Sequence, residues 1–254
     1  MRASLKRPLV LFPVSIVLGL LVWEAIGRAL PKALLAPPSA VLGRLLTMTG
    51  DGALPLALLG SIQHMAVGYL LAVVVAIPVG IIVGRNVAVA TAVEPILNAI
   101  YAIPPVALVP FFIIWFGLYF EGRVALVFAM CFFEILISVL QGVRDIDRGL
   151  LDAARSLEVR GLALYRKVVI PAASPFIFTG LRVGIGRAVN AMITAELFFA
   201  AVNLGQILKN SGNAFDTASL FAVILVISLF GLFCQEGMRF AERLVIPWHH
   251  GRQT

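Results

Sequence analysis

Long apolar blocks separated by short charged gaps are the main pattern along this chain. Five blocks hold no charged residue or a single glutamate: residues 52–84, 95–120, 124–143, 188–208 and 217–235. A helix that spans a bilayer needs about 20 mostly apolar residues. An apolar run at 8–23 is a further candidate. We therefore predict a chain that crosses a membrane several times.

The spacing of these blocks predicts six transmembrane helices. Their expected ranges are 9–29, 56–84, 87–116, 123–141, 172–200 and 216–243. Composition supports this, because only 13% of the residues are charged and 61% are hydrophobic, whereas soluble domains carry about a quarter charged residues. We expect an all-α, polytopic membrane protein in which residues 1–254 form a single transmembrane domain, with its core at about 56–243.

The basic residues lie mainly in gaps on one side of the predicted helices. If the N-terminus is cytoplasmic, most of the 20 lysines and arginines also fall in the cytoplasm, as the positive-inside rule requires. We therefore expect both termini in the cytoplasm, and we interpret the net charge of +7 as a topology signal with no nucleic-acid partner. An alternative is that Arg2, Lys6 and Arg7 begin a signal peptide cleaved near 33–36. The later apolar blocks favour an uncleaved first helix.

Proline and small residues predict how several helices bend and pack. Prolines remove backbone donors and should kink or break the third helix; they are Pro95, Pro104, Pro105 and Pro110. Such a helix could simply be a kinked packing element, or it could line a pathway.

The pairs Gly80/Gly84 and Gly180/Gly184 allow close helix approach. Cys131 and Cys234 lie within apolar segments, so we expect packing residues and no disulfide.

The gap at about 142–171 is the longest charged segment, and it is cytoplasmic by the charge argument. Asp152 is expected to cap a helix start, and Ala153 and Ala154 favour helix. Apolar residues recur after them among arginines, which predicts short amphipathic helices outside the membrane. A solvated linker is the alternative, but it would leave those apolar side chains without a partner. We therefore predict a docking element.

The sequence of this element, DAARSLEVRGLALYRKVVIP, resembles the EAA loop of ABC importer permeases. Asp152, Ala153 and Ala154 match its opening, and the segment ending at Pro171 matches its close. The glycine of the family pattern falls on Glu158, with Gly161 the next glycine. The resemblance implies that this segment is a coupling helix that sits in a groove of a cytoplasmic ATPase. The implied contact residues are Asp152, Ala153, Ala154, Leu157, Glu158, Gly161 and Pro171.

The resemblance extends from about Trp23 to Trp248 and is nearest to nitrate, taurine and alkanesulfonate permeases; riboflavin- and thiamine-precursor permeases share these patterns. Two segments carry this resemblance. They are the proline-rich third helix, PILNAIYAIPPVALVPFFIIWFG, and the fifth helix, PAASPFIFTGLRVGIGRAVNAMITAEL. It implies the type I ABC importer permease fold in a bacterial inner membrane. It also implies three partners: a cytoplasmic ABC ATPase dimer, a second permease copy that makes a homodimer, and an extracytoplasmic solute-binding protein.

The chain itself carries no nucleotide-binding motif. None of its lysines follows a glycine, so there is no P-loop. We expect no enzyme activity and no cofactor in this chain, with ATP and Mg²⁺ bound to the partner ATPase.

Ionisable residues inside predicted membrane helices are candidates for the translocation path, because their burial in lipid is costly. They are His64, Glu134, Arg182, Arg187 and Glu196. Structural roles are the alternatives: snorkelling or pairing for the arginines, an interfacial position for Glu196 and packing for His64. For Glu134 we favour a pair within the bundle. No catalytic constellation or metal site is expected.

The predicted function is the membrane-spanning subunit of an ATP-driven importer for a small solute. Arg182 and Arg187 would suit an anion, of the sulfonate or nitrate kind, but a vitamin-precursor-like solute stays open. An ATP-independent secondary transporter or channel is the main alternative, and it would be favoured by inverted repeats. A membrane enzyme would need polar residues clustered at one interface, which this sequence lacks.

Overall fold

The computed structural model describes residues 7–247, and within them it is built from helices with no strand. Arg2, Lys6 and Trp248, which figured in the sequence analysis, lie outside the described residues. Along the chain the helices are α1 (Arg7–Ala29), α2 (Pro38–Gly50), α3 (Ala53–Arg85), α4 (Val87–Tyr101), α5 (Pro105–Phe116), α6 (Phe120–Arg144), α7 (Arg148–Ser156), α8 (Gly161–Leu164), α9 (Ile170–Phe198), α10 (Asn203–Asn213) and α11 (Thr217–Val245). A π-helical turn, Tyr165–Val169, joins α8 to α9. The all-α prediction is confirmed.

The predicted membrane helices are present. Among the described residues, α1, α3, α6, α9 and α11 are long and apolar enough to span a bilayer. A sixth candidate is the pair α4 and α5, which is bent by 98°. The bend falls where Pro104 precedes α5 and Pro105 begins it, so the predicted break is confirmed there. Pro95 and Pro110 lie inside α4 and α5 without ending either helix.

The described chain divides into two compact units, and the boundaries fall within α3, after Ala200 and within α11. We call residues 7–59 and 201–228 the terminal unit, and residues 60–200 and 229–247 the central unit. The prediction of a single transmembrane domain stays a prediction.

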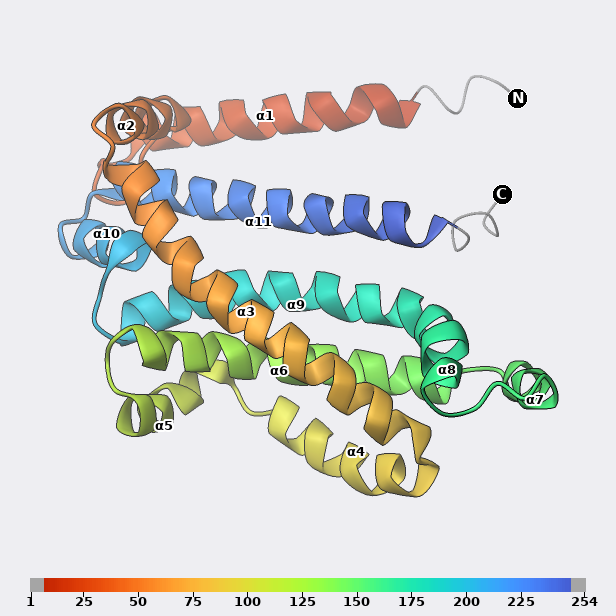
Figure 1. Cartoon of the computed structure of the whole chain (residues 1–254). Helices are drawn as coiled ribbons and strands as arrows, with labels where there is room; N and C mark the ends of the chain where they lie inside the picture. Colours follow the sequence, from red (N-terminus) through yellow and green to blue (C-terminus); the bar gives the residue numbers. More distant parts are fainter. Residues whose placement is uncertain (1–6, 248–254) are drawn as a thin grey trace. The chain divides into compact units, whose positions relative to one another are not determined.

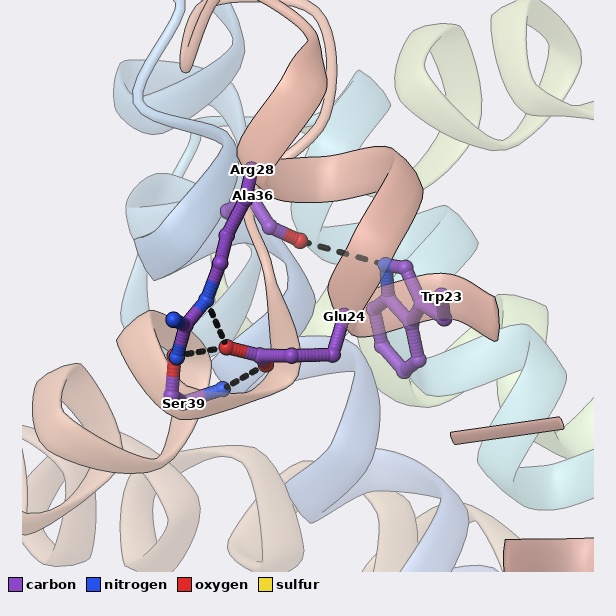
Figure 2. Close-up of polar contacts among 5 residues, drawn as sticks. All are labelled: Trp23, Glu24, Arg28, Ala36 and Ser39. Carbon is purple, nitrogen blue, oxygen red and sulfur yellow. Dashed lines mark hydrogen bonds and ion pairs between the residues drawn. The ribbon is translucent and has the colours of Figure 1, made fainter. Parts of the chain in front are cut away.

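In the terminal unit, the loop after α1 is held by two neighbouring side chains of that helix (Figure 2). Trp23 Nε1 donates to the Ala36 carbonyl at 3.1 Å. The Glu24 carboxylate accepts from the backbone N–H of Ser39 at 3.0 Å and from its hydroxyl at 2.7 Å. Arg28 Nε donates to the same carboxylate at 2.6 Å. Because α2 begins on prolines and has no side-chain cap of its own, Glu24 supplies the acceptor that its first turn needs.

The terminal unit also contains helices that the apolar pattern did not predict, α2 and α10. Both are short, and helices of this length depend on tertiary contacts. Val41 of α2 is buried against Ala222 of α11, with Trp23 packed beside them. Before α11, Asp216 accepts from Ser219 N and Oγ at 3.1 and 2.6 Å. These hydrogen bonds from Ser219, together with the nearby charge of Arg44, lower the pKa of Asp216 below its usual value.

The central unit is organised around α6, which lies beside α9 and is crossed by α3 (Figure 1). Glycines of α3 face valines of α6 in three pairs: Gly68 with Val127, Gly80 with Val139, and Gly84 with Val143. The sequence separation is the same in each pair, so α3 and α6 run in the same direction. A Cβ atom on Gly80 would lie 2.8 Å from Val139 Cγ1. The close approach predicted from these glycines is therefore confirmed.

Helix α9 packs against α6 in the opposite direction. Gly180 faces Ser138, and Gly184 faces Ile135, one turn back along α6. A Cβ atom on Gly180 would lie 2.9 Å from Ser138 Cβ. Cys131 is buried in this interface as a free thiol, with its Sγ 3.4 Å from the Gly184 carbonyl. Small residues thus bring the three helices α3, α6 and α9 together.

Candidate functional site

The predicted coupling loop forms the helix α7 and a turn that follows it. Asp147 is the residue before α7, and its carboxylate accepts from the backbone N–H groups of Gly149 and Leu150 at 2.6 and 3.2 Å. The prediction that Asp152 caps a helix start is therefore wrong. Asp152 lies inside α7, where it pairs with Arg155 at 3.0 Å. The helix starts one turn earlier than expected because Asp147 offers a capping carboxylate first.

The turn after α7 contains Glu158 in the left-handed backbone region, with φ of 58°. The Glu158 N–H donates to the Arg155 carbonyl at 2.9 Å, and the Val159 N–H donates to the Ala154 carbonyl at 3.0 Å. This pair of bonds is a Schellman motif, in which glycine is the usual left-handed residue. Glu158 occupies the position where the resembling family has glycine, so the turn geometry is kept without glycine. Gly161 begins α8 with φ of 55°.

The coupling residues differ in whether the chain itself covers them. Ala154 is buried, while Leu157 and Leu162 are 78% and 74% exposed. Asp152, Ala153 and Glu158 are exposed as well. The described chain therefore leaves the side chains of both leucines uncovered. Of the residues predicted to contact an ATPase, Ala154 is thus packed within the chain, whereas Leu157 is free to contact a partner.

The end of the predicted coupling loop continues into α9 without a break. Residues 161–198 form one continuous helical run through α8, the π-helical turn and α9, and Pro171 lies in the first turn of α9. Leu164 and Val169 are buried and anchor this run. The Arg85 guanidinium, at the end of α3, lies 5.9 Å from the centroid of the Tyr165 ring. The loop and α9 are therefore joined by continuous helical backbone.

Two of the predicted pathway residues meet in the central unit. Arg187 Nε of α9 donates to Glu134 Oε2 of α6 at 3.2 Å. Arg187 Nη2 donates to the Tyr101 hydroxyl of α4 at 2.6 Å, and its guanidinium lies 5.5 Å from the centroid of that ring. The Glu134 side chain is 15% exposed and that of Arg187 is 39% exposed. The bundle partner favoured for Glu134 is thus Arg187, and Tyr101 completes the group.

A cavity of about 240 Å³ lies beside this ion pair, between α4, α6 and α9. Its lining residues are Asn98, Tyr101, Glu134, Ile137, Ser138, Gln141, Thr179, Gly180 and Val183. Arg187 borders a second, apolar gap of about 50 Å³, shared with Tyr101 and Phe133. The ion pair therefore stands between a polar cavity and an apolar one.

Arg182 has a different partner. Its Nη1 lies 3.4 Å from Glu242 Oε2 on α11, and Glu242 is 8% exposed. Neither residue lines the cavity beside Glu134. The structure thus separates the two arginines that the sequence analysis had grouped.

His64 and Glu196 meet in a second, fully buried cluster. Glu196 is 0% exposed and His64 is 1% exposed. Glu196 Oε1 accepts from the Ser61 hydroxyl at 2.7 Å and lies 3.8 Å from His64 Nε2. Arg123 of α6 contributes a positive charge that interacts with Glu196. The carboxylate of Glu196 thus lies inside the helix bundle, hydrogen-bonded to Ser61.

Four partners of the predicted residues were missed from the sequence: Ser61, Tyr101, Arg123 and Glu242. Tyr101 ends α4 next to the Pro104–Pro105 break, and Arg123 stands in the first turn of α6, but no local pattern marks either as a partner. Within residues 7–247, no group of three or more His, Cys, Asp or Glu side chains could hold a metal ion.

Apolar spans and a proline-broken helix together define a polytopic membrane protein. The family described as "Binding-protein-dependent transport system inner membrane component" matches residues 76–245. The chain belongs to this family, the membrane-spanning permeases of ABC importers.

Known relatives share sequence along most of the chain. The taurine transport system permease protein of Escherichia coli K12 is 31% identical, over 98% of this chain and 93% of that protein. The putative aliphatic sulfonates transport permease protein of Bacillus subtilis 168 is 29% identical, over 75% of this chain and 69% of that protein. The nitrate import permease protein of Leptolyngbya laminosa is 30% identical, over 74% and 67%.

The fold also matches a solved transporter. An inward-facing structure of the MetNI methionine ABC transporter superposes with a TM-score of 0.67, covering 78% of this chain and 98% of that chain at 20% sequence identity. The predicted permease fold is therefore confirmed. As an ABC importer permease, the chain works with an ATPase and a binding protein.

Proposed function

We propose that this chain forms the path for a small charged solute and is driven by a separate ATPase that docks on the 152–171 loop. One observation carries the proposal. Leu162, which is 74% exposed, and Arg187, which pairs with the cavity residue Glu134, lie on the same continuous helical run, residues 161–198. A force applied at the loop would reach the ion pair without crossing a hinge, as alternating access requires.

The orientation follows from the charges that end the helices. Arg85 and Arg144 are the last residues of α3 and α6, which run in the same direction. Both ends, with the coupling loop, are cytoplasmic by the positive-inside rule. Both termini then lie in the cytoplasm, and ATP with Mg²⁺ is bound and hydrolysed on the partner ATPase dimer. A second copy of this chain completes the permease as a homodimer.

The substrate class is supported by the names of the relatives. Taurine, aliphatic sulfonates and nitrate are all small and carry an anionic group. The guanidinium of Arg187, which pairs with the cavity residue Glu134, would suit such a group. The solute would be delivered by an extracytoplasmic binding protein and pass the cavity between α4, α6 and α9.

The test is reconstitution of this chain with its cognate ATPase and binding protein in liposomes. We expect a stable complex, ATP hydrolysis stimulated by the loaded binding protein, and uptake that depends on ATP. Leu157→Asp should abolish stimulation, while Leu157→Met, which keeps the apolar contact, should retain it. Uptake that follows an ion gradient, with no associated ATPase, would overturn the proposal and favour a secondary transporter.

A further inference from the structure

Phe215, in the turn between α10 and α11 of the terminal unit, combines a strained backbone with an exposed side chain. Its φ is 53°, in the left-handed region, and the residue is 70% exposed. The Phe215 N–H donates to the Gly212 carbonyl at 3.2 Å, and the Asp216 N–H donates to the Ser211 carbonyl at 2.9 Å. This is a Schellman motif, in which the left-handed residue is usually glycine. A bulky residue in this conformation is a steric outlier, and its exposed ring gains little packing within the chain to offset the strain.

A cavity of about 150 Å³ lies beside Phe215 in the terminal unit, and Phe215 lines it. One wall contains Asp216 and Thr217 at the start of α11, and the other contains Lys32 and Pro37 of the loop between α1 and α2. The Thr217 hydroxyl donates to the Lys32 carbonyl at 2.6 Å, so the two walls are fastened to each other. At ~30 Å³ for each group the size of a water molecule, the volume corresponds to roughly five such groups. The cavity therefore has room for one short side chain of a partner.

The cavity carries one positive charge that the chain does not neutralise. The Asp216 carboxylate accepts from the Ser219 hydroxyl at 2.6 Å and lies 3.9 Å from Arg44 Nε, so it already has partners. The exposed side chain of Lys32 takes part in no ion pair within residues 7–247. The group that complements this ammonium is a carboxylate from outside the chain.

The position of the cavity favours a protein over lipid as its partner. Helix α11 begins beside the cavity and carries Arg239 and Arg243 toward its other end, so the positive-inside rule puts the cavity on the extracytoplasmic side. The charged groups of Lys32 and Asp216 in its lining keep water beside the ring of Phe215. Lipid would also cover an exposed ring in any backbone conformation, whereas contact with a folded protein requires the ring in one place.

From these observations we infer that Phe215 and the adjacent cavity are a contact point for the extracytoplasmic solute-binding protein. Phe215 packs on an apolar surface of that protein, while one of its carboxylates enters the cavity and pairs with Lys32. The fastened backbone holds the ring and the ammonium in place before contact, which reduces the entropy lost on association. This inference rests on the proposed function and its orientation, and adds the surface through which the solute is delivered.

The first test separates affinity from stability. Phe215→Gly removes the ring and also relieves the strained φ, so the Tm of the permease–ATPase complex in nanodiscs should stay equal or rise. The Kd of the solute-loaded binding protein for that complex, measured by biolayer interferometry, should nevertheless rise at least about tenfold, as for loss of an aromatic anchor. Leu46→Ala is the matched control, because Leu46 is 73% exposed in the same unit and does not line the cavity. It should keep the wild-type Kd.

The second test addresses the charge. Lys32→Gln should raise the Kd by about three- to tenfold and should reduce the loss of affinity that added salt causes in wild type. Lys209→Gln removes the charge of an exposed lysine of α10 that does not line the cavity. This control should keep the wild-type Kd and its salt dependence.

The inference is overturned if the binding protein does not bind the wild-type complex, if Phe215→Gly keeps the wild-type Kd, or if Lys209→Gln weakens binding as much as Lys32→Gln. A lower Tm of Phe215→Gly with an unchanged Kd would place the ring against lipid. ATP-driven uptake by the reconstituted importer tests the proposed function separately. If only the contact is wrong, wild type and Phe215→Gly should take up solute equally, whereas failure of the proposed function would abolish ATP-driven uptake by wild type.

Discussion

The bundle of helices α3, α6 and α9 differs from the predicted coupling loop, which contains α7 and α8, in how far its residues are buried. In the bundle, glycines admit neighbouring backbones and the carboxylate of Glu196 is fully buried. In the loop, Leu157 and Leu162 are exposed, and Glu158 holds a backbone conformation that glycine usually adopts. The difference teaches that substitutions in the bundle should act on stability, whereas substitutions at the loop surface should act on the contact with a partner.

The largest expected effect on stability is in the buried cluster of the bundle. Glu196→Leu removes the carboxylate that accepts from Ser61 and that balances the charge of Arg123. Loss of one partner from a buried charge cluster should lower the free energy of unfolding by about 3 kcal/mol. Thermal unfolding in detergent micelles measures it. Glu134→Gln changes a partly exposed side chain and should lower the free energy of unfolding clearly less. An equal loss of stability in the two variants would contradict the distinction between the two clusters.

The next largest effect on stability is expected where α3 approaches α6 closely. Gly80→Ala places a Cβ atom 2.8 Å from Val139 Cγ1 and 3.3 Å from the Leu136 carbonyl oxygen. Overpacking of this kind should destabilise the protein by about 1–3 kcal/mol. The control is Gly237→Ala in α11, where a Cβ atom meets nothing within 4 Å and alanine favours helix. If the two variants unfold at the same temperature, the tight α3–α6 contact is not what holds the bundle.

A smaller effect of opposite sign is expected in the turn of the loop. Glu158→Gly should stabilise the turn by roughly 1 kcal/mol, because glycine adopts a positive φ without the steric cost of a β-carbon. Slower amide hydrogen exchange of Val159 would report it. Gly161→Ala imposes a β-carbon at φ of 55° and should destabilise the loop by a similar amount. Faster exchange in Glu158→Gly would show that the carboxylate makes a contact worth more than the strain.

The smallest effect on stability belongs to the exposed leucine. Leu157→Asp changes a side chain that is 78% exposed, so the free energy of unfolding should move by no more than about 0.5 kcal/mol. Its effect should appear only as loss of ATPase binding in co-purification. A drop in Tm comparable with that of Gly80→Ala would mean that the chain itself buries this leucine.

Much of the fold could be predicted from local sequence. The uncharged blocks predicted the spans because a bilayer demands about 20 apolar residues in a row. The pair Pro104–Pro105 predicted a break because proline lacks a backbone donor. The short helices α2 and α10 could not be predicted in this way. For α2, the cap that its first turn needs comes from Glu24, which is 15 residues away from Ser39.

The candidate sites likewise combine features that local sequence predicts with features that only helix packing creates. Sequence alone predicted an amphipathic loop after α6 and five ionisable residues inside candidate membrane helices, because composition and local spacing indicate both. Only the tertiary structure decided that Glu134 pairs with Arg187, 53 residues further on, and that Glu196 pairs with Ser61, 135 residues before it. The physical reason is that a charge in a bilayer must be neutralised by whatever group helix packing brings within hydrogen-bond distance, and that packing is set by the glycines that let α3, α6 and α9 approach.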